Sequence, residues 1–339
     1  MWPSIKDLKP EELKDKTVWL RVDFNVAMEG GKVTEGYRID RGLETINFLK
    51  SNGAKIILAT HLSDKPARPD GRSGGAASLE PVIEYLKQKI SLDGITILPN
   101  LRSFAGEESN DESLAREWAS AADIYVNEAF SASHREHASI VGLPKLLPHY
   151  AGLNFTQEVE TLSKCFEPVH PSLLVVGGAK LESKQPVIDK FKPIVDKILI
   201  GGKLVYEFLD NTDPQIVMSK ELVREGDPST PLGAGKIFDV VITDEIKELV
   251  KNAKRIIWAG PMGMYDNGYA QGTLDLAQVV LDSDAEVVIG GGDTIAAISD
   301  LLKAKSWNLK ATQFVSTGGG AMLQFLATGT LPGIEALKS

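Results

Sequence analysis

The clearest pattern along the chain is an alternation of short apolar runs with longer amphipathic stretches. In the first half, apolar runs rich in β-branched residues predict strands over 17–26, 55–60, 95–98 and 124–126. The amphipathic stretches between them predict helices, for instance over 79–90 and 110–121. Strands that alternate with helices form parallel sheets covered on both faces, and ligands bind beyond the carboxyl ends of such strands.

The second half repeats one arrangement, an apolar run that ends in a glycine-rich turn. Five runs follow it, at 173–176, 198–200, 255–258, 287–289 and 314–315. They predict a second parallel sheet whose edge is mostly bare backbone, where N–H groups and helix N-termini suit a phosphate. In Gly290-Gly291-Gly292-Asp293-Thr294 the turn leads into a helix. Asp293 has two interpretations there, a ligand for a hard cation such as Mg²⁺ or a helix N-cap.

A break between the two halves indicates two domains. Apolar residues at helical spacing predict a helix over 152–165, and Pro168 and Pro171 then interrupt the pattern. A chain of 339 residues also exceeds what one hydrophobic core usually supports. We therefore expect a first domain over 1–150, a connecting helix over 151–166 and a second domain over 167–329.

The composition is that of a water-soluble globular protein and narrows the classes of partner. Hydrophobic residues make up 43% and charged residues 24%, and no apolar run approaches the ~20 residues that a membrane helix needs. The formal net charge of −9 argues against nucleic-acid binding, which usually requires a basic surface. The single cysteine, Cys165, and the lack of a signal-peptide pattern after Met1 fit a reducing cytoplasm. We expect a cytoplasmic monomer with no membrane or nucleic-acid partner.

Basic residues that suit anion binding gather in the first domain. It holds eight of the ten arginines and four of the five histidines, and arginine binds carboxylates and phosphates through paired hydrogen bonds. Polar side chains that follow the predicted strands are expected to converge on one edge of the sheet: Asp23, Asn25, Arg38, His61, Arg102 and Arg135. Arg38 has an alternative role as a surface residue at a helix start, and Arg102 in a loop salt bridge. His134 and His137 have the spacing of a metal pair without companion ligands, which favours structural histidines.

Lys180 and Lys184 are candidate phosphate ligands in the second domain. Four residues apart at a predicted helix start, they would lie on one face and point at the same anion; the alternative is a pair of solvated lysines. No G-x-x-x-x-G-K-[ST] loop is present, so a nucleotide site here would be of a less common type. No G-x-G-x-x-G follows the first strand either, and the lack of this dinucleotide-binding motif argues against an NAD-dependent dehydrogenase. An acid-binding domain paired with a nucleotide-phosphate domain suits phosphoryl transfer.

Motifs along nearly the whole chain resemble those of the phosphoglycerate kinases. They occur in the family's order: RVDFNV at 21–26, HL at 61–62, NLR at 100–102, HREHAS at 134–139, GGAK at 177–180, WAGPMG at 258–263, GGGDT at 290–294, STGGGA at 316–321 and LPG at 331–333. A single motif of this kind is weak, whereas this many in the correct order are specific. The resemblance implies two doubly wound, Rossmann-like α/β domains joined by a hinge helix. It also implies a C-terminal tail, about 330–339, that packs on the first domain.

The resemblance further implies a reaction and the residues that carry it. The family transfers a phosphoryl group between 1,3-bisphosphoglycerate and MgADP, giving 3-phosphoglycerate and MgATP, by direct in-line transfer after domain closure. By position in the motifs, the phosphoglycerate ligands are Asp23, Phe24, Asn25, Arg38, His61, Lys65, Arg102 and Arg135. The nucleotide ligands are Gly178, Ala179, Lys180, Lys184, Gly202, Pro261, Asp266, Gly291, Gly292, Asp293 and Thr294, with Asp293 as the Mg²⁺ ligand. Arg38, Lys180, Gly319 and Gly320 would act on the phosphoryl group during transfer.

Two departures from the family pattern concern single side chains. The loop after His61 is altered, so that either Lys65 or Arg68 supplies the usual substrate cation. Ala259 stands where the family often has Asn, and Asp266 stands where a Glu usually meets the ribose. Because Asp is shorter by one methylene, Asp266 would reach the ribose through a water molecule.

A third departure concerns a whole segment. The interval between Gly202 and Trp258 is short, so most of the segment that usually covers the base is missing. The leading hypothesis is an active phosphoglycerate kinase. The alternative is a non-catalytic nucleotide- or phosphoglycerate-binding protein derived from the same fold.

Overall fold

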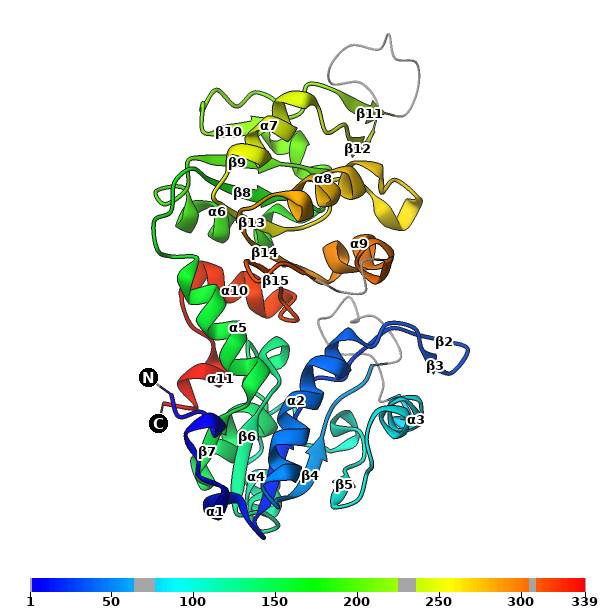
Figure 1. The fold of residues 1–339 in the computed structure, drawn as a ribbon, viewed down its shortest axis with the longest axis vertical. Helices are drawn as coiled ribbons and strands as arrows, with labels where there is room; N and C mark the ends of the chain where they lie inside the picture. Colours follow the sequence, from blue (N-terminus) through cyan, green and yellow to red (C-terminus); the bar gives the residue numbers. More distant parts are fainter. Residues whose placement is uncertain (1, 64–76, 225–235, 305–308, 339) are drawn as a thin grey trace. The chain divides into compact units, whose positions relative to one another are not determined.

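The computed structural model describes residues 2–63, 77–224, 236–304 and 309–338, and the chain divides into two compact units (Figure 1). Unit 1 consists of residues 1–159 and 330–339, and unit 2 of residues 160–329. The chain passes from unit 1 to unit 2 within one helix, α5 (Leu153–Lys164). Its C-terminal segment then returns to unit 1.

Unit 1 is built on a five-stranded parallel sheet with the strand order β5-β4-β1-β6-β7 (Figure 1). Its strands are β1 (Thr17–Arg21), β4 (Lys55–Ala59), β5 (Ile95–Ile97), β6 (Ile124–Asn127) and β7 (His149–Ala151). In the register, Val18 of β1 lies between Ile56 of β4 and Ile124 of β6. The strand order reverses at β1, and such a switch point leaves a crevice at the carboxyl ends of β1 and β6.

Side chains that alternate along β1 bury both faces of this sheet. Val18 and Leu20 are fully buried in the core that α2 (Tyr37–Ser51) closes with Ile46. Trp19 points to the other face, where its ring lies 5.4 Å from the ring of Trp118. The remaining helices of unit 1 are α1 (Pro10–Leu13), α3 (Glu80–Lys89), α4 (Glu112–Ala119) and α11 (Pro332–Glu335). A hairpin of β2 (Met28–Glu29) and β3 (Lys32–Val33) precedes α2.

Unit 2 is built on a six-stranded parallel sheet with the order β10-β9-β8-β13-β14-β15. Its strands are β8 (Ser172–Val176), β9 (Lys197–Ile200), β10 (Ile216–Met218), β13 (Arg255–Ala259), β14 (Glu286–Gly290) and β15 (Gln313–Val315). Its helices are α6 (Gln185–Phe191), α7 (Asp244–Asn252), α8 (Gln271–Asp282), α9 (Gly292–Ala304) and α10 (Gly320–Thr328). A separate antiparallel pair joins β11 (Leu222–Arg224) to β12 (Ile237–Val240). The order is that of doubly wound nucleotide-binding sheets, with the switch point between β8 and β13.

The prediction of two doubly wound parallel sheets is confirmed. All five glycine-terminated runs of the second half are strands of the second sheet. The structure adds β7 and β10, which the sequence pattern did not single out. Both are three-residue strands at a sheet edge, too short for a periodic signal.

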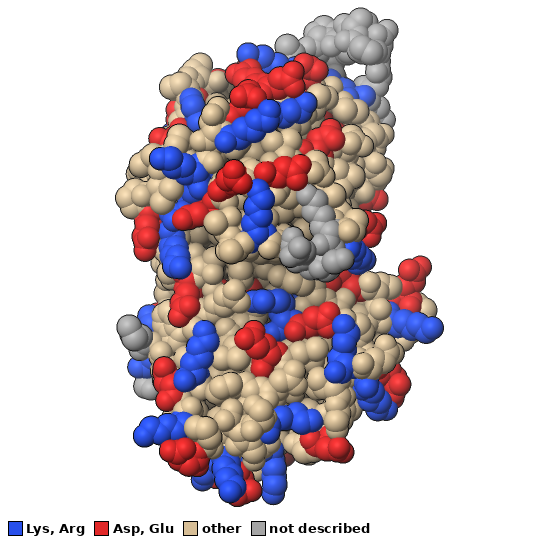
Figure 2. Space-filling view, viewed as in Figure 1, with Lys and Arg blue, Asp and Glu red and all other residues tan. Residues whose placement is uncertain are grey.

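Charged side chains of both signs are interspersed on the face of the molecule that Figure 2 shows. On the face seen in Figure 2, lysines and arginines alternate with aspartates and glutamates instead of gathering by sign. The helices of the described segments are all too short or too polar to cross a bilayer.

Candidate active site

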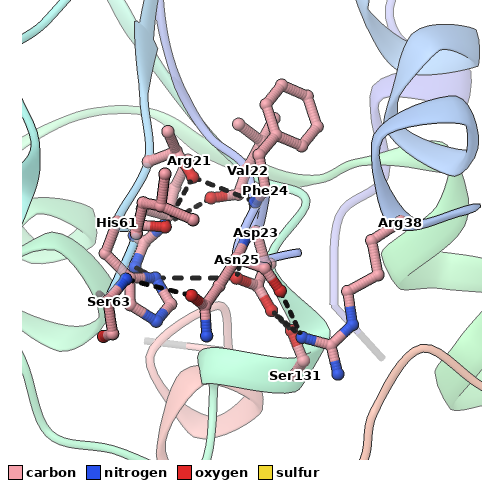
Figure 3. Close-up of polar contacts among 12 residues, drawn as sticks. Arg21, Val22, Asp23, Phe24, Asn25, Arg38, His61, Ser63 and Ser131 are labelled. Carbon is pink, nitrogen blue, oxygen red and sulfur yellow. Dashed lines mark hydrogen bonds and ion pairs between the residues drawn. The ribbon is translucent and has the colours of Figure 1, made fainter. Parts of the chain in front are cut away.

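The carboxylate of Asp23 is the centre of a polar cluster at the carboxyl end of β1. Figure 3 shows it between His61 and Arg38. Arg38 Nη1, from the first turn of α2, lies 3.2 Å from Asp23 Oδ2 and 3.1 Å from the main-chain oxygen of Asn25. His61 Nδ1, just after β4, lies 3.6 Å from Asp23 Oδ1, and the Ser131 hydroxyl donates to Oδ2. The sheet edge therefore brings Asp23, Asn25, Arg38 and His61 together, as the strand ends predict.

The charges around Asp23 set the protonation of this cluster. Burial opposes ionisation of Asp23, but the charge of Arg38 and the hydrogen bond from Ser131 outweigh it and hold the pKa of the carboxyl below its usual range. Burial lowers the pKa of His61 well below its usual value, with Asp23 opposing and Arg21 reinforcing the shift. At neutral pH the cluster thus contains an ionised Asp23 and an uncharged His61. Because Arg21 can only donate, the His61 Nδ1 that lies 3.2 Å from its Nη2 is the acceptor, which leaves the proton on Nε2.

Arg21 is a buried cation that the sequence analysis did not assign to the site. Its side chain is 1% exposed, and it donates to the Val22 carbonyl and to Ser139 Oγ at 3.0 Å. Ser139 in turn donates to the carboxylate of Glu107 through both its N–H and its hydroxyl. A guanidinium held this way is rigid, so it fixes the imidazole of His61. An arginine as the last residue of an apolar strand was the signal available.

Arg102 and Arg135 extend the positive charge of the cluster. Arg102 forms an ion pair with Glu108, which is the loop salt bridge considered for it, and its guanidinium is also within electrostatic reach of Arg135 and Arg21. Burial, followed by those two arginines, lowers the pKa of Arg102 to about 10. Arg135 Nε donates to His134 Nε2 at 3.4 Å. Several guanidinium groups thus lie close enough to repel one another, and a bound anionic ligand would offset this repulsion.

The histidines of the HREHAS motif are integrated into the same network. His137 Nδ1 lies 3.7 Å from Glu107 Oε1, and burial followed by the charge of Arg102 lowers the pKa of His137 to about 3. Within 2–63, 77–224, 236–304 and 309–338, no set of three or more His, Cys, Asp or Glu side chains is placed to hold a metal. Through its Nε2, His134 joins Arg135, and through its Nδ1, His137 faces Glu107.

Two predicted phosphoglycerate ligands, Phe24 and Lys65, need separate comment. The side chain of Phe24 is 1% exposed and packs in the core, so only its backbone remains for a ligand; its N–H donates to Thr60 Oγ1 at 3.0 Å. The predicted role of Phe24 as a phosphoglycerate ligand therefore rests on its backbone and stays a prediction. Phe24 lies beyond the end of β1 at Arg21 and, like Val22, packs in the core of unit 1. Lys65 and its alternative Arg68 lie outside the described residues.

Unit 2 contains a cavity of about 350 Å³ at the switch point of its sheet. It is lined by Gly177, Gly178, Ala179, Lys180, Ser183, Lys184, Gly260, Pro261, Gly291, Gly292, Asp293, Thr294, Gly319, Gly320 and Leu323. The turns after β8, β13 and β14 supply most of this wall, so much of it is backbone. Both α9 and α10 begin here, and their first N–H groups make the cavity attractive to an anion.

The turns around this cavity meet so closely that they require glycine. Gly260 has φ +112°, and a Cβ there would lie 2.1 Å from the carbonyl oxygen of Gly177. Gly202 has φ +62°, and its Cβ would lie 2.6 Å from the nitrogen of Gly178. Two backbone-to-backbone contacts therefore join the turns after β8, β9 and β13. Gly202 itself supports the cavity wall without lining it.

Charged and hydroxyl groups face the cavity from two helix starts. Lys184 and Asp293 line the same cavity, and burial lowers the pKa of Lys184 to about 8 while the charge of Asp293 opposes the shift. Asp293 falls within the first turn of α9, which begins at Gly292, so the N-cap interpretation of Asp293 is wrong. Thr294 Oγ1 accepts from the N–H of Gly260 at 2.8 Å and is fully buried. Thr294 thus ties α9 to the turn after β13.

Lys180 and Lys184 reach the cavity by a different route from the predicted one. A 3₁₀ turn, Leu181–Ser183, separates them, and α6 begins only at Gln185. The α-helical spacing argument is therefore wrong in its geometry. Both lysines nevertheless line the same cavity, Lys180 exposed and Lys184 buried.

A second, mostly apolar cavity of about 550 Å³ was not predicted. It is lined by Lys203, Tyr206, Lys236, Ile237, Phe238, Met264, Asn267 and Tyr269. The rings of Phe238 and Tyr269 stack with their centroids 4.5 Å apart and their planes 8° apart. The N–H of Lys203 donates to the carbonyl of Gly178, a residue of the first cavity, at 2.8 Å. The two cavities therefore flank the same backbone junction. Asp266 lines neither of them but lies between the lining residues Met264 and Asn267.

Comparison with known families agrees with the motifs. The family model "Phosphoglycerate kinase" matches residues 5–94, 88–229 and 236–329. Phosphoglycerate kinases from two strains of Leptospira biflexa serovar Patoc are 34% identical, with 97% of this chain and 97% of each relative covered. The alignment spans 394 positions, more than the 339 residues of this chain, so the relatives carry segments that this chain lacks.

Solved structures agree in fold over the full length. The phosphoglycerate kinase of Coxiella burnetii superposes with a TM-score of 0.78 at 28% identity, covering 100% of this chain and 99% of the other. That of Pyrococcus horikoshii OT3 superposes with a TM-score of 0.81 at 25% identity, covering 99% and 98%.

Proposed function

Because the chain belongs to the phosphoglycerate kinase family of enzymes, we propose that it transfers a phosphoryl group between 1,3-bisphosphoglycerate and MgADP, giving 3-phosphoglycerate and MgATP. The observation that carries the proposal is the presence of two different anion sites, one in each unit. Unit 1 has a cluster of cationic side chains around Asp23, and unit 2 has a backbone-lined cavity with Lys184 and Asp293. A kinase needs both, one for the acid and one for the nucleotide.

In unit 1, the cluster suits a small phosphorylated acid. Arg38 is held at two points, by Asp23 and by the Asn25 carbonyl, yet its side chain keeps 23% of its surface exposed for a ligand. The His61 Nε2–H, the Asn25 amide and the guanidinium of Arg135 would add directional donors. Arg102 would contribute through its charge, since its side chain is already paired with Glu108.

In unit 2, the two cavities suit the two ends of a nucleotide. The smaller cavity would take the phosphates, with the backbone N–H groups of Gly178, Gly291 and Gly292 and the ammonium groups of Lys180 and Lys184 as donors. The larger, aromatic-lined cavity would take the nucleoside, with Asp266 near the ribose. Asp293 fits a Mg²⁺ ion, since one carboxylate combined with substrate phosphates is a common magnesium site. The bound ion would neutralise charge on those phosphates.

Catalysis in this proposal is positioning combined with neutralisation of charge. The chain's own contributions are the Arg38 guanidinium, the Lys180 ammonium and the N–H groups at the start of α10, Gly319 and Gly320. They would surround the equatorial oxygens of the phosphoryl group as it passes directly from one oxygen to the other. Closure of the two domains would bring the reactants in line and exclude water. We also propose that the protein is a monomer located in the cytoplasm.

The experiment that tests this function measures turnover and binding on the same preparation. With 3-phosphoglycerate and MgATP, a coupled assay should show steady consumption of ATP that depends on both substrates and on Mg²⁺. Calorimetry should show that the protein binds ADP in the absence of 3-phosphoglycerate, and 3-phosphoglycerate in the absence of ADP. Binding of both ligands without turnover above background would instead establish the binding-protein alternative, which the shortened segment before Trp258 motivates.

A further inference from the structure

A side chain of α3 holds the first turn of α2, which carries Arg38. Tyr85 lies on α3, and its hydroxyl donates to the carboxylate of Asp40, whose oxygens are 3.0 and 3.1 Å away. A Cβ built on Gly36 would lie only 2.2 Å from the same hydroxyl oxygen. Tyr85 therefore contacts the residue two positions before Arg38 and the residue two positions after it.

The contact between Tyr85 and Asp40 is reinforced from the same helix. Lys89 Nζ lies 3.2 Å from Asp40 Oδ1 and 5.1 Å from the centre of the Tyr85 ring. The ring of Tyr85 also packs against the core of unit 1, so α3 offers a fixed surface to the start of α2. Gly36 has φ −103°, which any residue can adopt, so its backbone conformation does not require glycine. The lack of a side chain at Gly36 instead leaves room for the hydroxyl of Tyr85.

The turn held in this way is the one that positions the guanidinium of Arg38. The N–H of Asp40 donates to the carbonyl of Gly36 at 2.9 Å, which closes the first turn of α2 around Arg38. At its other end Arg38 is bonded to Asp23 and to the Asn25 carbonyl. Small displacements of a group that acts on a phosphoryl in transfer cost a large part of the rate.

We infer that Tyr85 is a positioning residue for Arg38: its hydroxyl fixes Gly36 and Asp40, and thereby the first turn of α2 and the direction of the guanidinium. The inference rests on the proposed role of Arg38 in phosphoryl transfer. Tyr85 itself touches no reacting atom in this arrangement. Its removal should therefore act on the rate of transfer and leave the nucleotide site in unit 2 unchanged.

The test is the steady-state kinetics of the Tyr85→Phe enzyme. We expect kcat to fall about tenfold while KM for MgATP stays within about twofold of the unmodified enzyme, because an interaction that acts in the transition state is lost. Asp40→Ala should reproduce this fall, whereas Asp40→Asn retains an acceptor for the hydroxyl and should keep most of the rate. The matched control is Tyr150→Phe, which removes the hydroxyl of a tyrosine on β7 of the same unit and should leave kcat unchanged.

A double-mutant cycle separates positioning of Arg38 from a general structural role. In an Arg38→Lys background, Tyr85→Phe should have little further effect, because both changes act through one group. The same fold-loss in both backgrounds, or a kcat for Tyr85→Phe within about twofold of the unmodified enzyme, would overturn the inference. If Arg38→Ala itself left turnover intact, the proposed function of Arg38 and this inference would fail together. A damaged Arg38→Ala enzyme beside an intact Tyr85→Phe enzyme would remove only the role of Tyr85.

Discussion

Lys184 is a buried cation whose charge depends on pH close to neutrality. Burial lowers the pKa of its ammonium group to about 8, and the neighbouring Asp293 limits the shift. The group is charged below this pH and loses its charge as the pH rises through it. In the proposed nucleotide site the charged form would bind phosphate, so the free protein should lose affinity for nucleotides at mildly alkaline pH.

We predict that the dissociation constant for ADP rises as the pH is raised through about 8. Lys184→Arg should flatten this dependence, because a guanidinium stays charged throughout that range. Calorimetric titrations across that pH range, on both proteins at constant ionic strength, check the prediction. An equally steep rise in Lys184→Arg would assign the dependence to another group.

We predict that the ring of Phe238 contributes to nucleotide affinity, and that it contributes equally whichever base the nucleotide carries. Its ring stacks on Tyr269 in a wall with few buried polar groups, so the cavity offers a stacking surface more than a pattern of donors and acceptors. Phe238→Ala should weaken binding by about 1–3 kcal/mol, and by a similar factor for ADP and GDP. Competition titrations with the two nucleotides measure this. A loss confined to ADP would show that the site reads the edge of adenine.

At the scale of elements, the buried carboxyl group of Glu128, whose pKa burial raises to about 8, anchors the start of α5. It accepts hydrogen bonds from Thr45 Oγ1 of α2 and from the N–H groups of Asn154 and Phe155. The N–H of Leu153 donates to Thr45 Oγ1, so the two helices share one network. This helix is the segment through which the chain leaves unit 1.

Glu128→Ala should lower the free energy of unfolding by about 2 kcal/mol, because the buried N–H groups of Asn154 and Phe155 lose their acceptor. Glu160→Ala, which removes an exposed glutamate on α5, is the matched control. Urea denaturation of the two variants measures the difference. Equal effects of the two substitutions would mean that the Glu128 network does not stabilise the fold.

The strands and their carboxyl ends could be predicted from sequence because each rests on a local signal. An apolar run that ends in glycine or in a polar residue marks both the strand and the position of its turn. Asp23, Asn25, Arg38 and His61 were therefore placed on one edge correctly, as was the glycine-rich wall in unit 2. Because the strands of each sheet are parallel, their carboxyl ends lie at one edge, and no further information is needed to place these residues together.

Two other features of the site could not be predicted from the pattern of apolar residues. The pairing of Phe238 with Tyr269 joins residues far apart in the chain, so no periodic pattern could reveal it. Local hydrogen bonding decides that a 3₁₀ turn, and not an α-helix, separates Lys180 from Lys184. Apolar spacing cannot distinguish these two kinds of turn over so few residues.

At the scale of the molecule, unit 1 is closed by the last segment of the chain. Leu331, Ile334 and Leu337 are buried, and the N–H of Gly333 donates to the carbonyl of Ser133 at 2.9 Å. A Cβ on Gly333 would lie 2.6 Å from the side chain of Ser133, so the contact is tight. The segment therefore supports the loop that also carries Arg135.

A chain that ends at Gly329 should have a destabilised unit 1 and an intact unit 2. We expect hydrogen exchange to accelerate over residues 130–142, because the apolar surface that the tail covers becomes exposed. Exchange in β8 and β13, deep in unit 2, should be unchanged and serves as the internal control. Unaltered exchange over 130–142 would contradict this role of the tail.

The central claim is that the cationic cluster of unit 1 and the cavity of unit 2 act on the same phosphoryl group. The most direct measurement is the turnover of Arg38→Ala and of Lys184→Met, each combined with calorimetry of both ligands. We predict that each variant retains affinity for the ligand of the other unit, ADP for Arg38→Ala and 3-phosphoglycerate for Lys184→Met. Each should nevertheless lose kcat by about a hundredfold or more. Turnover within about twofold of the unmodified enzyme in either variant would contradict the claim.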